Sequence, residues 1–486
     1  MKSIRENCGL FGLYSQRDCV HDIYQGIDFL QHRGQEYCGI STYSYNTKRM
    51  KQIDFLETQK EERDSDISFG KEINHVTHHG KVINTFTDEE LQTLKGHWGI
   101  GHVSLWERQP MKWQTRLGEI AVAFSGNVIN ADELMKKMMD RGKSYYKSYH
   151  IETISKVIIE EPDIVSGIKA LARKVKGAYS LVVLNRDGIY ATRDVYGFRP
   201  LMLGRDADRC AVSSESRAIQ NLGMHTVRDI RPGEIILIND KGFQTVAQVD
   251  SPRIAHCAFE WAYTASIDSI IDGVFVQEAR NNLGAQLAQR DIDDGDTTAD
   301  IVAPVPLSGI GHALGYHHRS NIPYQEVFLY HRYADRSYMQ ATQIARKRMA
   351  KRKLSVLNYA VKGKKIIICD DSIVRGTQIM YKVRDLKEAG AQQVHVRISC
   401  PPLMYPCDFG ISTRSYDELI VRQLMKKGDI MSMRQLQEVE AWIAHRTGAD
   451  TVKFNTVDAF VSALMIPRKN LCLRCFDGVN PLEDWS

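Results

Sequence analysis

The sequence lacks a long hydrophobic run, a secretion signal and a large net charge. No apolar stretch reaches the roughly 18 residues that a membrane-spanning helix needs, and residues 1–7 are polar and charged, unlike a signal peptide. The net charge is +5 over 486 residues, too small to indicate a nucleic-acid or membrane surface for the protein as a whole. We therefore expect a cytosolic protein with no nucleic-acid partner and no membrane partner.

The sequence also lacks internal repeats, low-complexity tracts and the signs of a disulfide framework. Its 10 cysteines belong to a long chain without a secretion signal, so metal binding or catalysis is their expected use. Cys472 and Cys475 form a C-x-x-C close to the C-terminus. A content of 43% hydrophobic and 25% charged residues is typical of a globular protein, here long enough for two or three domains.

Short strands dominate the first half of the chain, whereas strands and helices alternate in the second. Strands are predicted at residues 38–45, 98–104, 120–125, 178–185, 188–193 and 201–204, and helices at 20–30, 130–141 and 152–159. This order predicts a β-rich α+β domain up to about residue 250. From residue 277 onward the alternation predicts βαβ units and a parallel sheet, with the boundary between the two parts at residues 250–265.

The most informative stretch covers residues 364–378. Residues 366–369 are an apolar run between polar residues and predict a buried parallel strand, and the spacing of Ile379, Val383 and Leu386 predicts a helix that ends near Gly390. The string D-D-S-I-V-R-G-T lies between them, at the carboxyl end of the strand, where open α/β sheets bind ligands. Loop amides at a helix N-terminus suit a monophosphate, and the two carboxylates suit ribose hydroxyls. An acidic strand end that merely caps the helix is the alternative.

This string resembles the phosphoribosyl pyrophosphate (PRPP) loop of the type I phosphoribosyltransferases, in the form used by amidophosphoribosyltransferases. The resemblance runs from Cys8 to about Pro481. It implies an α+β N-terminal nucleophile (Ntn) glutaminase-like domain at residues 8–250, after a possible propeptide at 1–7. An α/β type I phosphoribosyltransferase domain with a parallel sheet would follow at residues 251–486.

The resemblance also implies the reaction and its participants. The family displaces pyrophosphate from C1 of PRPP with ammonia, giving 5-phosphoribosylamine in the first step of purine synthesis, which is a glycosyltransferase reaction. The implied small-molecule substrates are PRPP and glutamine or ammonia, the implied metal is Mg²⁺, and the implied assembly is a homodimer or homotetramer.

Two loops and a lid are expected to bind PRPP. The implied PRPP-binding residues are Asp370, Asp371, Ser372, Ile373, Val374, Arg375, Gly376, Thr377, Ser308 and Arg336. Asp370 and Asp371 would hold the ribose hydroxyls and contact Mg²⁺ through PRPP. Lys353, at the end of the basic run 346–353, matches a lysine of the family's flexible lid, although the run alone also fits a solvated helix face or an RNA-binding patch. Leu307 stands where the family has an aspartate.

Cys8 resembles the catalytic cysteine of the class II glutamine amidotransferases. In that family the cysteine is the mature N-terminus, and its free α-amino group serves as the base for its own thiol. Residues 1–7 would then have to be removed, and a buried strand cysteine is the alternative. The resemblance further implies that Arg33 helps to build the glutamine pocket and that Gly126 offers its backbone N–H to the oxyanion.

Three positions depart from the glutaminase pattern. Ser104 replaces the arginine that binds the glutamine carboxylate, Ser125 replaces the asparagine that donates to the oxyanion, and His150 stands near the expected acidic residue. These departures favour a second hypothesis, a transferase that uses free ammonia or another amide donor. A third is a non-catalytic sensor of PRPP or nucleotides, which Leu307 favours and the intact loop 370–377 opposes.

Four cysteines match the ligand positions of the iron–sulfur subtype of this family: Cys257, Cys407, Cys472 and Cys475. Four cysteine thiolates are what a [4Fe–4S] cluster needs, and zinc is the alternative because four cysteines also suit it. The cluster would join the domain junction, the loop after residue 400 and the C-terminal tail. Its expected role is structural or oxygen-sensing, without redox catalysis.

Overall fold

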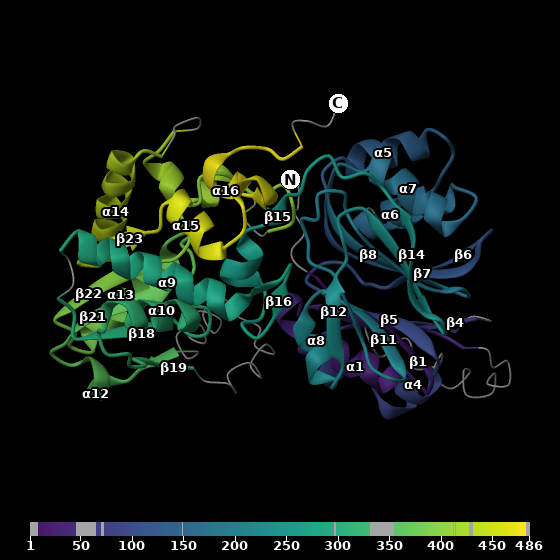
Figure 1. Cartoon of the computed structure of the whole chain (residues 1–486), viewed down its shortest axis with the longest axis horizontal. Coiled ribbons are helices and arrows are strands. Elements are labelled where there is room, and N and C mark those ends of the chain that lie inside the picture. Colours follow the sequence, from purple (N-terminus) through teal and green to yellow (C-terminus); the bar gives the residue numbers. More distant parts are fainter. Residues whose placement is uncertain are drawn as a thin grey trace.

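The computed structural model consists of two bodies that lie side by side (Figure 1). It describes residues 8–44, 65–69, 72–147, 149–295, 298–330, 354–411, 413, 415–426 and 431–482. Within these residues no helix is both long and apolar enough to cross a membrane. The lid prediction, with Arg336 and Lys353, lies outside the described residues.

The first body is built on two antiparallel sheets. The eight-stranded sheet has the order β12 (His225–Asp229), β10 (Met202–Arg205), β11 (Arg209–Ser213), β1 (Gly9–Ser15), β5 (Trp98–Ser104), β2 (Tyr37–Tyr43), β4 (Ile73–His79) and β3 (Ser65–Phe69). The six-stranded sheet has the order β14 (Gly242–Gln248), β13 (Glu234–Asn239), β9 (Gly188–Arg193), β8 (Gly177–Asn185), β7 (Gly118–Val128) and β6 (Met111–Thr115). Most of the strands predicted from the sequence are found within a few residues of their expected ends.

Helices cover the outer faces of both sheets, so the first body has four layers. Leu10, Ile100 and Val182 are fully buried in the apolar layer between the sheets. The eight-stranded sheet is covered by α1 (Val20–Phe29), α3 (Val82–Thr85), α4 (Asp88–Thr93) and α8 (Ser216–Asn221), and the six-stranded sheet by α5 (Ala131–Met139), α6 (His150–Ile159) and α7 (Ile164–Lys174). This architecture confirms the predicted α+β fold.

The second body is built on a four-stranded parallel sheet, as predicted. Its order is β18 (Ile301–Pro304), β21 (Lys365–Asp370), β22 (Gln393–Ile398) and β23 (Thr451–Phe454). Ile367 of β21 packs toward α9 (Val276–Asp293) and α10 (Ile310–Ser320) on one face, and Ile366 and Ile368 pack toward α13 (Thr377–Glu388) and α14 (Met433–Thr447) on the other. A sheet covered on both faces explains why β21 is a continuous apolar run.

Smaller elements complete the second body. They are α15 (Val457–Leu464), α12 (Asn358–Val361), α16 (Arg474–Asp477), the hairpin of β19 (Phe328–Tyr330) and β20 (Leu354–Val356), and the 3₁₀ turns η4 (Tyr416–Glu418), η5 (Ile420–Gln423) and η6 (Arg468–Asn470). Short pairings near the junction are β15 (His256–Cys257) with β24 (Leu471–Cys472), and β16 (Ile270–Ile271) with β17 (Val274–Phe275).

Buried charges join the two bodies. Arg193 of β9 donates to both carboxylate oxygens of Asp272, at 2.8 and 3.1 Å, from opposite sides of the predicted boundary. Asp229 of β12 lies beside this pair, and burial together with the charge of Asp272 raises the pKa of Asp229 to about 7. The junction is therefore held by ionic contacts as well as by apolar packing.

Candidate functional site

The loop after β21 carries the predicted phosphate-binding string. Gly376 has φ +75°, and a Cβ at this position would lie 2.4 Å from Cδ1 of Ile420, so both the backbone conformation and the packing require glycine. The 12-residue helix α13 begins directly after it, and Gly376 offers no side chain to cap its first turn. The first amides of α13 are therefore oriented to bind an anion at the carboxyl end of β21.

The acidic pair is held by hydrogen bonds from three elements. The Ser308 hydroxyl donates to Oδ1 of Asp370 at 3.0 Å, and the Lys382 ammonium donates to Oδ2 at 3.1 Å. The Ser372 hydroxyl donates to Asp371 at 2.6 Å. Burial and the neighbouring charge of Asp370 raise the pKa of Asp371 to about 7. The structure thus brings Ser308, a residue predicted to bind PRPP, next to the acidic pair, and adds Lys382, which sequence reasoning missed.

The remaining loop residues point in different directions. Ile373 is buried in the sheet core, and the Val374 carbonyl accepts a hydrogen bond from the N–H of Ile420 at 2.8 Å. The side chain of Arg375 is 67% exposed and pairs with Glu418. Of these three residues, only Arg375 has a side chain that can reach a ligand in solvent, so Ile373 and Val374 can contribute only through their backbone.

The structure brings Cys8, which directly precedes β1, next to Ser125 and Gly126 of β7. The N–H of Cys8 donates to Oγ of Ser125 at 3.2 Å, and the Ser125 hydroxyl donates to the Cys8 carbonyl at 2.9 Å. Gly126 follows with φ +148°, and a Cβ there would lie 1.9 Å from the carbonyl oxygen of Ala178. Ser125 therefore holds the backbone of Cys8, and no larger residue fits at Gly126 in this backbone conformation.

Arg33 lies at the junction between the two bodies and is 2% exposed. Its guanidinium donates to Glu215 and, at 2.7 Å, to Glu260, which also accepts a 2.7 Å bond from Arg199. Burial opposes the ionisation of Glu215, but His32 and Arg33 hold its pKa well below the ordinary value. The two carboxylates engage the guanidinium of Arg33, and its assignment to a glutamine pocket stays a prediction.

At Ser104, where the family has the arginine that binds the glutamine carboxylate, the chain forms a small, buried, hydrogen-bonded loop. The Ser104 hydroxyl, 1% exposed as a residue, donates to the carbonyl of Glu107 at 2.5 Å. The Glu107 carboxylate accepts the N–H groups of His150 at 2.9 Å and Ile151 at 3.3 Å, at the start of α6. A carboxylate at a helix N-terminus is favourable, so Glu107 stabilises the start of α6.

The four predicted cluster ligands come from three segments that the fold brings together. Cys257 and Cys472 are directly paired in the parallel β15–β24 ladder. The sulfur of Cys407 accepts the N–H groups of Phe409 at 3.3 Å and Ile411 at 3.4 Å. The carbonyl of Cys475 accepts the N–H groups of Met404 and Tyr405, which attaches the tail to the loop after residue 400.

The four thiols lie close enough together for their charges to act on one another. Burial raises the pKa of Cys257 to about 12, while Arg199 acts in the opposite direction. In the described residues no three His, Cys, Asp or Glu side chains converge to hold one metal ion. All ten cysteines are described, and none is in a disulfide.

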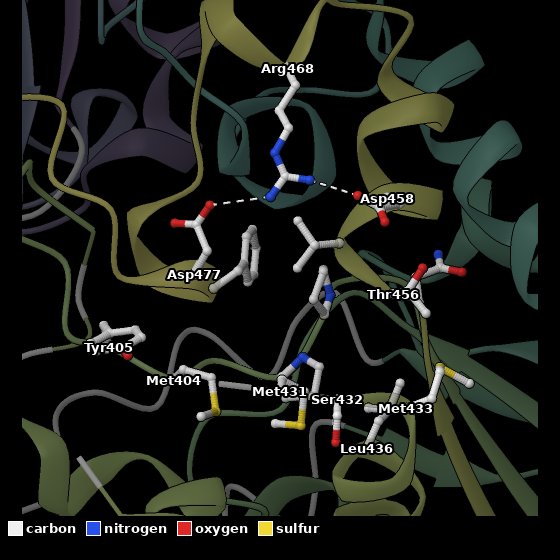
Figure 2. Close-up of a pocket in the computed structure, with 15 residues that line it drawn as sticks. Met404, Tyr405, Met431, Ser432, Met433, Leu436, Thr456, Asp458, Arg468 and Asp477 are labelled. Atoms are coloured by element: carbon white, nitrogen blue, oxygen red, sulfur yellow. Dashed lines mark hydrogen bonds and ion pairs between the residues drawn. The ribbon is translucent and has the colours of Figure 1, made fainter. Parts of the chain in front are cut away.

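A separate pocket of about 400 Å³ lies beyond the carboxyl ends of β22 and β23. Arg468 lies opposite Met404 and Met433 and bonds to Asp458 at 2.6 Å and Asp477 at 3.5 Å (Figure 2). Its lining contains no residue of the string 370–377. The pocket is therefore distinct from the loop that carries the acidic pair.

Comparison with known proteins relates both bodies to one family. A glutamine amidotransferase domain model matches residues 102–221. The chain is 34% identical to the amidophosphoribosyltransferase of Methanothermobacter thermautotrophicus, over 98% of this chain and 95% of that protein. It is 32% identical to the amidophosphoribosyltransferase of Bacillus subtilis, over 99% of this chain and 96% of that protein.

A solved structure agrees with these relatives. The glutamine PRPP amidotransferase from B. subtilis, complexed with ADP and GMP, superposes with a TM-score of 0.83 at 31% identity, covering 98% of this chain and 97% of that one. An Ntn glutaminase fold followed by a phosphoribosyltransferase fold is the architecture described above. Sequence identity over nearly the whole chain and this shared architecture together show that the protein belongs to the amidophosphoribosyltransferase family.

Proposed function

We propose that the loop after β21 and the loop after β18 bind PRPP between them. The observation that carries this proposal is the 3.0 Å bond from Ser308 to Asp370, which joins the carboxyl ends of two neighbouring parallel strands. Asp370 and Asp371 hold the ribose hydroxyls, and the amides of residues 372–377 hold the 5′-phosphate at the start of α13. Arg336 and Lys353 remain predicted contacts from the lid.

The acidic pair also fits a magnesium site completed by substrate. Mg²⁺ is commonly held by one or two carboxylates together with the phosphate oxygens of a substrate, and Asp370 and Asp371 supply the two carboxylates. When bound, Mg²⁺ neutralises charge on the departing pyrophosphate. The protein's own task is to orient C1 of the ribose toward the incoming nitrogen. The C1–N bond forms as the C1–O bond to pyrophosphate breaks, and ammonia releases one proton to water.

We further propose that free ammonia is the nitrogen source this chain uses most efficiently. The Ser125 hydroxyl is engaged with the Cys8 backbone, so it is not oriented as the oxyanion donor that an asparagine would provide. Ser104 brings no positive charge for the glutamine carboxylate, since its hydroxyl donates to the carbonyl of Glu107. Glutamine is the second candidate, favoured by the close approach of Cys8 and Gly126 if residues 1–7 are removed.

The four cysteines hold a [4Fe–4S] cluster in this proposal. The fold brings the three segments that carry these cysteines together, and two N–H groups are donated to the sulfur of Cys407; both observations support this proposal, with zinc as the alternative. Cys257, Cys407, Cys472 and Cys475 would fasten the junction, the loop after residue 400 and the tail. The proposed domains are 8–250 and 251–486, in a cytosolic homodimer or homotetramer.

The test is pyrophosphate release from PRPP and Mg²⁺ by anaerobically purified protein, with ammonium chloride or glutamine as parallel nitrogen sources. We expect turnover with ammonia that is lost in Asp371→Asn and kept in Cys8→Ala. Glutamine-dependent turnover on a chain that mass measurement shows to begin at Cys8 would refute the ammonia proposal. Binding of PRPP without turnover on either source would favour the sensor alternative.

A further inference from the structure

Lys382 is a charged residue on the inner face of α13. Its neighbours on that face, Ile379, Val383 and Leu386, are buried in the sheet core, and its own side chain is only 14% exposed. A lysine that loses water in this way needs a partner that compensates for the lost hydration. The partner is Oδ2 of Asp370, at 3.1 Å.

Asp370 is thereby held from two sides by different elements. Ser308 of the loop after β18 donates to Oδ1 at 3.0 Å, while Lys382 of α13 donates to Oδ2. The N–H of Asp371 adds a third bond, also at 3.0 Å and to Oδ1. The carboxylate cannot rotate without breaking at least one charge-assisted bond, so its orientation toward the ligand space is fixed before any ligand binds.

The charge balance around the acidic pair gives Lys382 a second role. Two adjacent buried carboxylates would repel a substrate that carries three phosphoryl groups. The loop after β18 brings no compensating charge, because Leu307, 64% exposed, precedes Ser308. Arg280 also lies near Asp371, but its Nε and Nη2 donate to the carbonyls of residues 261, 263 and 265. Within the part of the chain that the structure describes, Lys382 is the cation that hydrogen-bonds to the pair directly.

We propose that Lys382 is a positioning residue of the PRPP site. Lys382 orients Asp370, and its positive charge makes PRPP binding less dependent on a divalent cation. The inference rests on the proposed function of the loops. It concerns a step that precedes the chemistry, so direct binding measurements can test it without turnover.

The test compares Lys382→Met, Lys382→Arg and the matched control Lys387→Met. Lys387 lies on the same helix, is 40% exposed and pairs with Asp450 at 3.2 Å, away from the acidic pair. Binding of PRPP is measured by calorimetry, once with Mg²⁺ and once with a chelator. Steady-state kinetics with ammonia then separates KM for PRPP from kcat.

We expect Lys382→Met to weaken PRPP binding about tenfold in chelator, the effect of about 1.4 kcal/mol, and clearly less at saturating Mg²⁺. In Lys382→Met, KM for PRPP should rise while kcat changes less. Lys382→Arg should restore most of the PRPP binding, and Lys387→Met should bind PRPP as the unchanged protein does. If Lys382 had a purely structural role, Lys382→Met would weaken PRPP binding equally with Mg²⁺ and with chelator. Lys382→Arg would then restore binding no more in chelator than in Mg²⁺.

Equal PRPP affinity of Lys382→Met and unchanged protein in both media would overturn the inference while leaving the proposed function standing. Absence of PRPP binding by the unchanged protein, with and without Mg²⁺, would overturn both. If Lys382→Met does not fold, Ser308→Ala and Lys382→Arg carry the test. The inference then requires that Ser308→Ala weakens binding and that Lys382→Arg binds in chelator, and failure of either refutes it.

Discussion

Glu260 is the residue whose loss should show most clearly how much the buried charges contribute at the junction. It is 1% exposed and accepts one hydrogen bond of 2.7 Å from Arg33 and another of 2.7 Å from Arg199. The change Glu260→Gln keeps the size of the side chain and one acceptor oxygen, and removes only the negative charge. Arg33 would then keep the carboxylate of Glu215 as an anionic partner, whereas Arg199 would lose the carboxylate of Glu260.

Breaking a buried ion pair by removing one partner costs about 3–5 kcal/mol, because the other charge stays desolvated. For a cooperative unit of this length the entropy of unfolding is about 1 kcal/mol per degree, so the expected fall in Tm is roughly 3–5 °C. Differential scanning calorimetry at neutral pH measures it. Combining Glu260→Gln with Arg199→Met should cost less than the sum of the two single changes, since the residues share one network.

Glu133→Gln is the matched control, because Glu133 forms an exposed pair with Lys137 at 2.6 Å and should leave Tm unchanged. A Tm of Glu260→Gln within error of this control would refute the reasoning. Strict additivity in the double variant would refute it in a second way, since it would mean that Glu260 and Arg199 do not act as one network.

Three further changes test other parts of the structure. Asp229→Asn should gain stability relative to the unchanged protein as pH rises from 5 to 8 in thermal melts, because burial raises the pKa of Asp229 to about 7 and its ionisation destabilises the fold over that range. Gly126→Ala should lower the free energy of unfolding by about 2 kcal/mol or more, because its Cβ would lie 1.9 Å from a carbonyl oxygen. Its control Gly142→Ala, at a position with φ +79° and no atom within 4 Å, should lower the free energy of unfolding by only about 1 kcal/mol. Cys472→Ser should lose most of the roughly four irons per chain that anaerobic protein should carry, while Cys210→Ser should retain them.

Local patterns in the sequence sufficed to predict the sheet and its ligand loop. The apolar run 366–369 and the helical spacing after it gave β21 and α13 nearly to the residue. Both signals are local, since they depend only on the periodicity of neighbouring side chains. The sequence predicted this helix from residue 152, whereas α6 begins at His150, because the carboxylate at its start belongs to Glu107, far away in the chain.

Contacts between distant segments could not be predicted in the same way. Arg33 was assigned to a pocket, but its partners Glu215 and Glu260 lie in other elements that only the fold brings near. Lys382 did leave a local signal, since it is a charge on an otherwise apolar helix face. That signal indicates a buried partner but does not identify Asp370, because helix periodicity says nothing about the neighbouring strand.

The pairing of β15 with β24 has a consequence for the order of events during synthesis. Cys257 emerges from the ribosome long before Cys472, and the whole parallel sheet is made between them. The first body and most of the second can therefore fold while the last strand of this ladder is still unmade. Assembly of the proposed cluster would have to follow synthesis of Cys472 and Cys475, and any chain cut short before its tail would expose the unpaired edge of β15 to proteases and to aggregation.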